Sequence, residues 1–199
     1  MKLNKFLTFF IFFLITFSTI SNSYSIEPDV FVQSTVNRAS EALNNKFTIE
    51  EKIAKLKSIA DETVDIKGIG FYTLGSYRKD LNDEQKKIYQ DLFKKYFLKS
   101  FSSRLAEYSN PEIEVTFKKK INENYTIVSS TLVSTDSRPE VKIQWRVYTK
   151  NPDNLLIRDL IIEGLSLART QKEEFSSIID SNNGNIEVLI KSLSEFVTQ

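Results

Sequence analysis

The sequence lacks two residue types on which much enzyme chemistry depends. Its 199 residues include no cysteine and no histidine. Without cysteine there are no disulfide bonds, no thiolate nucleophile and no cysteine-ligated metal site. Without histidine there is no imidazole base, no histidine metal ligand and no Ser-His-Asp triad. These function classes are excluded, and packing alone must hold the fold.

An excess of charge of either sign is also absent. The chain has 27 Lys and Arg residues against 26 Asp and Glu residues. A balance this even provides no global field that would recruit nucleic acid, so we expect no nucleic-acid partner.

The N-terminus has the pattern of a secretory signal peptide. Lys2 and Lys5 precede an apolar run, and small polar residues follow as far as Ser25. The run is only about a dozen residues long, which is short for a membrane-spanning helix. We therefore expect a leader over residues 1–25, cleaved near Ser25, and a single exported, soluble domain over residues 26–199.

Helical periodicity dominates the first half of that domain. A first helix is expected from Pro28, and Thr48 with Glu51 forms a capping box that opens a second helix. The apolar residues of this second helix, all expected to be buried, are Ile49, Ile53, Leu56, Ile59 and Ala60. A short, largely buried helix is expected over residues 64–74, with Gly75 in the left-handed position that ends it.

The next stretch has the strongest helical spacing of apolar residues in the chain, and one long helix is expected there. Asn82 caps its start, with Gln85 reaching back as in a capping box. Its apolar stripe, which demands a large apolar partner, consists of Tyr89, Phe93, Phe97, Phe101 and Leu105. Lysines including Lys86, Lys87 and Lys94 occupy the other side. They could dock on anionic headgroups or an acidic partner, or form a solvated face.

From Ile113 the period of the sequence changes from helical to two. Four strands are expected over residues 113–117, 125–134, 141–148 and 155–162. They should form an antiparallel meander with one face exposed to solvent. Two more helices are expected after them, around residues 173–179 and 186–197. This order of helices, strands and helices indicates an α+β fold in which helices cover the apolar face of the sheet.

The segment Gly164-Leu165-Ser166-Leu167-Ala168 is similar to a Gly-x-Ser-x-Gly nucleophile elbow. A nucleophilic serine needs a base, and no histidine is present. We therefore expect Ser166 to cap a helix. Asp159 and Glu163 are expected to pair with Arg158, Arg146 or backbone donors.

Three segments together resemble the MlaC family of periplasmic phospholipid-binding proteins, also called toluene-tolerance proteins. The segments lie at residues 64–97, 141–148 and 158–179, and their family-like residues are Asp65, Leu74-Gly75, Glu84-Gln85, Phe93, Trp145, Asp159 and Glu163-Gly164-x-Ser166. The resemblance implies a curved antiparallel or mixed sheet whose covering helices enclose a hydrophobic lipid cavity. It also implies a monomeric carrier that has no catalytic residues, metal or cofactor beyond its phospholipid cargo.

By the same resemblance, the carrier would shuttle lipid across the periplasm. Its partners would be an outer-membrane lipoprotein–porin complex and an inner-membrane ABC transporter with an MCE-domain ring. The residues expected to line the cavity are Phe71, Leu74, Phe93, Phe97, Phe101, Ile143, Trp145, Val147, Leu160, Ile162, Leu165 and Phe175. Three alternatives stay open: a carrier of another amphiphile such as a hopanoid, a periplasmic scaffold with a solid core, and a hydrolase using Ser166.

Overall fold

The computed structural model describes residues 26–136 and 138–199, so the expected leader lies outside the described residues. The helices of the described chain are α2 (Pro28–Ala42), α3 (Ile49–Thr63), α4 (Ile66–Thr73), the 3-10 helix η1 (Gly75–Lys79), α5 (Asp83–Ala106), α6 (Leu167–Asp180) and α7 (Ile186–Thr198). The strands are β1 (Ile113–Asn122), β2 (Tyr125–Leu132), β3 (Val141–Tyr148), β4 (Leu156–Ile162) and β5 (Leu165–Ser166).

All five strands form one antiparallel sheet in the order β1-β2-β3-β4-β5. The predicted α+β class and meander are confirmed. The two-residue β5 was not predicted, because a strand this short has no periodicity to detect.

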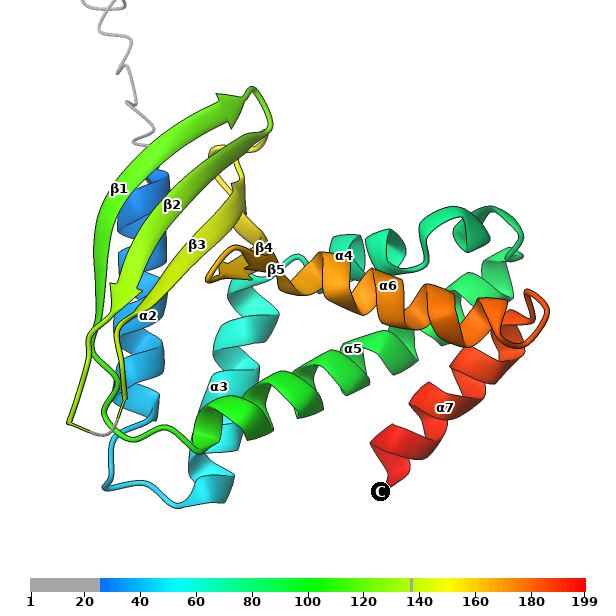
Figure 1. Cartoon of the computed structure of the whole chain (residues 1–199), viewed down its shortest axis with the longest axis horizontal. Coiled ribbons are helices and arrows are strands. Elements are labelled where there is room, and N and C mark those ends of the chain that lie inside the picture. The colour runs from blue at the N-terminus through cyan, green and yellow to red at the C-terminus, as the bar shows by residue number, and fades with distance from the viewer. Residues whose placement is uncertain (1–25, 137) are drawn as a thin grey trace, which may run out of the picture.

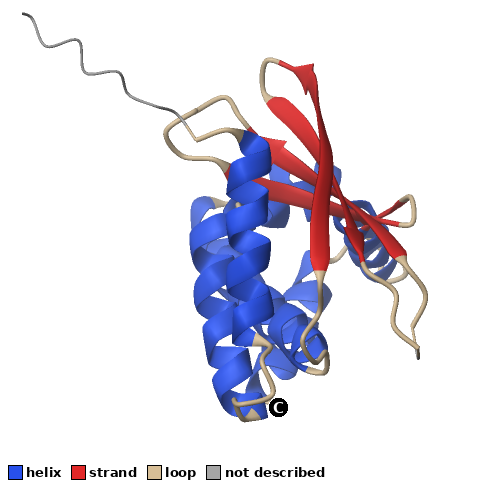
Figure 2. Cartoon of the chain, turned by 90° about the vertical axis from the view of Figure 1, so that its left-hand side faces the viewer, coloured by secondary structure: helices blue, strands red, loops and turns tan. Residues whose placement is uncertain are grey.

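The elements gather into two groups, shown in Figure 1. On one side the curved sheet has α2 behind it, and on the other side α4, α5, α6 and α7 pack together. Helix α3 packs against both α2 and α5, and Figure 2 shows α2 and α3 side by side next to the sheet.

Side-chain caps fix the starts of α3 and α5 as the sequence predicted. Thr48 and Asn82 each form a capping box, with Glu51 and Gln85 respectively. Gly75 has a φ of 56°, which confirms the left-handed position after α4. One expectation was wrong: Ile49 is 50% exposed, because as the first residue of α3 it lies beyond the neighbouring helices that bury the next turns.

Three separate apolar clusters hold the chain together. The helical core joins α4, α5, α6 and α7 and contains no residue of the sheet. The sheet core joins α2 to β2, β3 and the residue before β4. The bridging core joins α2, α3 and the end of α5. The described chain therefore has several small cores in place of one continuous interior.

Candidate functional site

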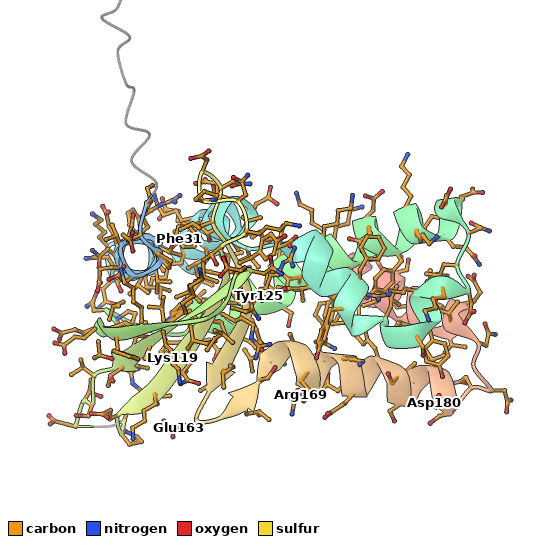
Figure 3. The ribbon with its side chains drawn as sticks, turned by 90° about the horizontal axis from the view of Figure 1, so that it is seen from above. Phe31, Lys119, Tyr125, Glu163, Arg169 and Asp180 are labelled. Carbon is orange, nitrogen blue, oxygen red and sulfur yellow. The ribbon has the colours of Figure 1, made fainter. Side chains whose placement is uncertain are left out.

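The face of the sheet that α2 covers, called the inner face here, is built from alternate residues of the central strands. Two rows of register partners run across it from β2 to β4: Val128, Trp145 and Leu160 form one row, and Ser130, Ile143 and Ile162 form the other. Figure 3 shows Phe31 of α2 and Lys119 of β1 on opposite sides of the sheet. The alternation predicted for β3 thus places Trp145 and its neighbours on this inner face.

Burial decreases along both rows from β2 toward β4. Val128 and Ser130 are buried, Ile143 lies at the limit of burial, and Trp145, Leu160 and Ile162 are only half-buried. Helix α2 contacts β1 and β2, whereas α4 and α6 contact β4. Trp145, Leu160 and Ile162 therefore keep apolar surface that no helix fully covers, whereas the neighbouring register partners Val147 and Ile157 are buried.

Trp145 is held in a defined orientation on this face. Its indole Nε1 donates a hydrogen bond of 2.8 Å to the Oγ of Ser130 in the neighbouring strand. Satisfying the one polar group of the ring leaves its apolar remainder available for contact with other groups.

A ladder of aromatic rings runs along α5, as the i, i+4 spacing predicted. The ring centroids of Tyr89 and Phe93 are 5.8 Å apart, those of Phe93 and Phe97 are 6.2 Å apart, and those of Phe97 and Phe101 are 5.5 Å apart. Burial falls along this ladder, because Tyr89 and Phe93 are fully buried whereas Phe97 and Phe101 are half-buried. The last two rings therefore present apolar surface beyond the helical core.

At the buried end of the ladder, the Tyr89 hydroxyl has its hydrogen-bond partners inside the protein. The Tyr89 hydroxyl lies 2.9 Å from the Oγ1 of Thr73 and 3.1 Å from the carbonyl oxygen of Gly70. Burial raises the pKa of Tyr89 above its ordinary value of 10.0, although the hydrogen bond with Thr73 acts to lower it. A Cβ on Gly70 would lie 2.8 Å from the Phe93 ring, so only glycine permits this close approach of α4 to α5.

The twelve residues predicted to line a cavity fall into three sets. Five belong to or pack on the helical core: Phe71, Leu74, Phe93, Phe97 and Phe175. Two belong to or pack on the sheet core: Trp145 and Val147. The other five belong to none of the three cores: Phe101, Ile143, Leu160, Ile162 and Leu165, of which Leu165 is 58% exposed.

Polar contacts join the helical group to the sheet at one point that the sequence did not reveal. The Nε of Arg158 in β4 donates to Oδ2 of Asp65 at 2.6 Å, and its guanidinium carbon lies 3.7 Å from the centroid of the Tyr148 ring. Its NH1 donates to the Tyr125 hydroxyl at 2.8 Å. Burial acts to lower the pKa of Arg158, but the hydrogen bonds with Tyr125 and Asp65 outweigh it, and the pKa is raised.

Asp65 is also the N-cap of α4, where its Oδ1 accepts a hydrogen bond from the amide of Gly68 at 2.8 Å. The expected partners of Asp159 and Glu163 were Arg158, Arg146 or backbone donors, and this expectation is confirmed through Arg146 for Asp159 and the backbone amide of Lys142 for Glu163. Arg158 itself pairs with Asp65 instead. Arg158 and Asp65 are 93 residues apart. Sequence patterns cannot pair charges over such a separation.

Ser166 is the N-cap of α6, as predicted, and its oxygen accepts from the amide of Arg169 at 3.1 Å. Its hydroxyl donates to Oδ2 of the buried Asp159 at 2.6 Å. Asp159 also accepts from the amide of Ala168 at 3.0 Å and lies 3.5 Å from the NH1 of Arg146. The family-like aspartate and serine therefore anchor the start of α6 to β4.

A surface hollow of about 680 Å³ lies between the end of α3, α4, the first half of α5 and the loop before β4. Of the twelve predicted residues only Phe71 lines it, and eight of its fourteen lining residues are charged. Within residues 26–136 and 138–199, no group of three or more carboxylates could hold a metal ion. The same ranges contain no helix with the length and apolarity needed to cross a bilayer.

Comparison with known proteins identifies what this architecture is similar to. The family model described as "MlaC protein" matches residues 33–195. A curated relative, the intermembrane phospholipid transport system binding protein MlaC of Haemophilus influenzae, is 22% identical over 195 residues, which cover 94% of this chain and 88% of the relative.

A solved structure, that of a phospholipid-binding protein from Ralstonia solanacearum in complex with a phospholipid, has the same fold. The two structures align with a TM-score of 0.73 at 20% sequence identity, over 87% of this chain and 98% of the other. The predicted fold class, α+β with an antiparallel sheet and covering helices, is therefore confirmed.

Proposed function

Because this chain belongs to the MlaC protein family, we propose that it is a periplasmic phospholipid carrier that encloses the acyl chains of its cargo. The observation that carries the proposal is the decrease in burial toward β4 on the inner face of the sheet. Ile143, Leu160 and Ile162 of this face, and Phe101 of α5, belong to none of the three cores of the described chain. The names of the Haemophilus and Ralstonia proteins, which refer to phospholipid, support the same cargo.

In this proposal the wall of the cavity includes Phe101, Ile143, Leu160 and Ile162, with Phe97 and Trp145 at its borders. All six present apolar side chains, so contact with acyl chains costs no desolvated polar group. The other predicted residues lie deeper, in the packed cores, or in the case of Leu165 at an exposed position next to the inner face. They support the wall or contact the cargo near its entrance.

A carrier is needed because acyl chains are costly to expose to water. Two chains with about 30 methylenes in total require on the order of 24 kcal/mol to enter water, at about 0.8 kcal/mol for each methylene. No lipid crosses an aqueous gap at a useful rate against such a barrier. We therefore propose that the protein acts as a monomer that shuttles lipid between an outer-membrane lipoprotein–porin complex and an inner-membrane ABC transporter with an MCE-domain ring.

The test is recovery of lipid from the protein. Delipidated protein is incubated with vesicles of phosphatidylethanolamine and phosphatidylglycerol, re-isolated by gel filtration, and extracted with organic solvent for mass spectrometry. We expect a stoichiometric phospholipid from the wild type and from the outer-face control Phe117→Ala, and a reduced amount from Leu160→Gln, which places an amide in the proposed wall. Protein recovered without lipid would instead identify a scaffold with a solid core.

The same experiment separates the remaining alternatives. If hopanoid added to the vesicles displaces phospholipid from the protein, the cargo is another amphiphile. Ester hydrolysis that disappears in Ser166→Ala would identify a hydrolase. The position of Ser166 favours the carrier, because its oxygen is engaged at the start of α6 with Arg169 and Asp159.

A further inference from the structure

Two leucines at the edge of the sheet are exposed to solvent although the first of them continues its inner face. Leu165 in β5 is the register partner of Ile162 in β4, and opposing residues of an antiparallel pair point to the same face. Leu165 is nevertheless 58% exposed, and Leu167, the first residue of α6, is 40% exposed. The apolar surface of the inner face therefore extends to a position that is open to water.

Hydrogen bonds on both sides hold these leucines in place. The turn before Leu165 has φ angles of 49° at Glu163 and 83° at Gly164, as a two-residue hairpin of type I′ requires. The Glu163 carboxylate accepts from the amide of Lys142 at 2.5 Å, which ties the turn to β3. After β5, the buried Asp159 anchors the first turn of α6. The exposure of the two leucines is thus fixed by the fold.

The side of α6 that carries Leu167 faces the second half of α5. Gln171 lies one turn after Leu167, and its Oε1 accepts from the hydroxyl of Tyr96 at 2.8 Å. Figure 1 shows α5 and α6 running in opposite directions, with the end of α5 and the start of α6 nearest to the sheet. Leu167 therefore lies toward the residues that follow Tyr96 on α5, which include Phe97 and Phe101.

The two elements thus present apolar side chains to each other next to the inner face. Leu165 and Leu167 are exposed on one side, and Phe97 and Phe101 are half-buried on the other. The hydrogen bond from Tyr96 to α6 marks where the helical core begins. Single exposed leucines are ordinary on protein surfaces. These two differ because they adjoin half-buried aromatic rings and the half-buried part of the sheet.

We propose that the acyl chains of the cargo enter and leave between the start of α6 and the second half of α5, and that Leu165 and Leu167 form one lip of this entrance. The inference rests on the proposed function. During transfer, part of each chain has left the wall and has not yet reached its destination. Apolar contact with the lip shields methylenes that water would otherwise surround at that stage, so the leucines lower the barrier to transfer. In the bound state the chains lie mainly along the inner face, where the leucines contribute less.

The test separates the rate of transfer from the amount of lipid bound. Protein loaded with a phospholipid that carries a fluorophore on its headgroup is mixed with excess vesicles that contain a quencher, and the loss of fluorescence gives the release rate. We expect Leu165→Gln/Leu167→Gln to release lipid about tenfold more slowly, as when roughly two methylenes lose apolar contact in the transition state. The amount bound at equilibrium should stay that of the wild type.

The matched control makes the same chemical change at two exposed apolar positions of β1. Phe117 and Ile121 are 62% and 53% exposed, and Phe117→Gln/Ile121→Gln should release lipid at the wild-type rate. An unchanged release rate in the Leu165→Gln/Leu167→Gln variant would overturn the entrance while the carrier function stands. A rate that falls equally in the control would overturn it as well.

A second measurement uses the wild-type protein. Phospholipids with a diazirine on the acyl chain, either near the glycerol or near the methyl end, are bound and irradiated, and cross-linked residues are mapped by mass spectrometry. We expect the probe near the glycerol to mark residues 165–167 and the probe near the methyl end to mark the inner face. Marking of residues 165–167 by neither probe contradicts the entrance. If the wild type takes up no lipid from vesicles, the proposed function fails, and the entrance fails with it.

Discussion

The helical core and the inner face of β3 and β4 are both rich in large apolar side chains, but they use them differently. In the helical core, Tyr89, Phe93 and Phe175 are at most 3% exposed, and aromatic rings contact one another from three helices. On the inner face, Trp145, Leu160 and Ile162 are half-buried. The same residue types thus fill a solid interior in one region and leave surface available in the other.

The difference comes from which elements cover each region. The long α5 has α3, α4 and α7 against it, so its aromatic stripe is covered over most of its length. On the sheet, α2 covers the β1 and β2 side, and β4 contacts α4 and α6. Trp145, Leu160 and Ile162 stay half-buried beside these helices, so a cargo would cover the apolar surface that remains on them.

The largest effect is expected where packing is complete. Phe93→Ala removes a fully buried ring that contacts Tyr89, Tyr96, Phe97 and Phe175, and we expect the free energy of unfolding to fall by about 3–5 kcal/mol. Urea denaturation measures the change. The matched control on the same helix is Ile88→Ala, whose side chain is 43% exposed and whose loss should stay below about 1 kcal/mol. Equal losses for the two variants would show that the helical core is not the solid region described.

The junction between the two regions should rank second. Arg158→Ala removes the cation that binds Asp65 and covers the Tyr148 ring, and we expect a loss of about 2 kcal/mol. Combining it with Asp65→Asn should cost less than the sum of the single changes, because both remove the same interaction. The exposed pair of Arg38 with Glu62 provides the control, with an expected loss below about 1 kcal/mol for Arg38→Ala. Strict additivity would indicate that Arg158 and Asp65 act independently.

Local features of both regions were predictable from the sequence, because short-range physics determines them. The capping boxes at Thr48 and Asn82, the left-handed Gly75 and the alternation of β3 all depend on residues within a few positions of one another. The choice of Ser166 as a helix cap followed from the missing histidine. These predictions required no knowledge of the tertiary structure.

Tertiary features were predicted less well. The pairing of Arg158 with Asp65 depends on the bridge between Val64 and Ile157, which no periodicity reveals. Ile49 fits a helical stripe but is exposed, because a stripe shows which side of a helix is apolar and not how far the covering partner extends. For the same reason the sequence could not separate Phe93, which fills a core, from Phe101, which lies outside every core.

A smaller effect, dependent on pH, is expected from Tyr89→Phe. Losing the hydroxyl contacts with Thr73 and Gly70 should cost about 1.5 kcal/mol at neutral pH. Burial raises the pKa of Tyr89 in the folded protein, so the unfolded chain releases this proton first and stability falls as pH rises above 10.0. The variant lacks this contribution, and its free energy of unfolding should fall less steeply between neutral and strongly alkaline pH. Parallel profiles for the two proteins would show that the Tyr89 site is accessible to water.

The smallest effect on the delipidated protein is expected on the inner face. Leu160→Ala removes a half-buried side chain that belongs to none of the three cores, so its cost without lipid should be about 1 kcal/mol or less. With lipid bound the cost should be larger, because a ligand that binds only the folded state stabilises the wild type more than a variant with weaker affinity. Thermal unfolding with and without lipid measures both values, and Ile121→Ala, at a 53% exposed position of β1, should show no such dependence. A loss of 3 kcal/mol or more without lipid would place Leu160 in a packed core and remove the difference between the two regions, because such losses are typical of fully buried leucines.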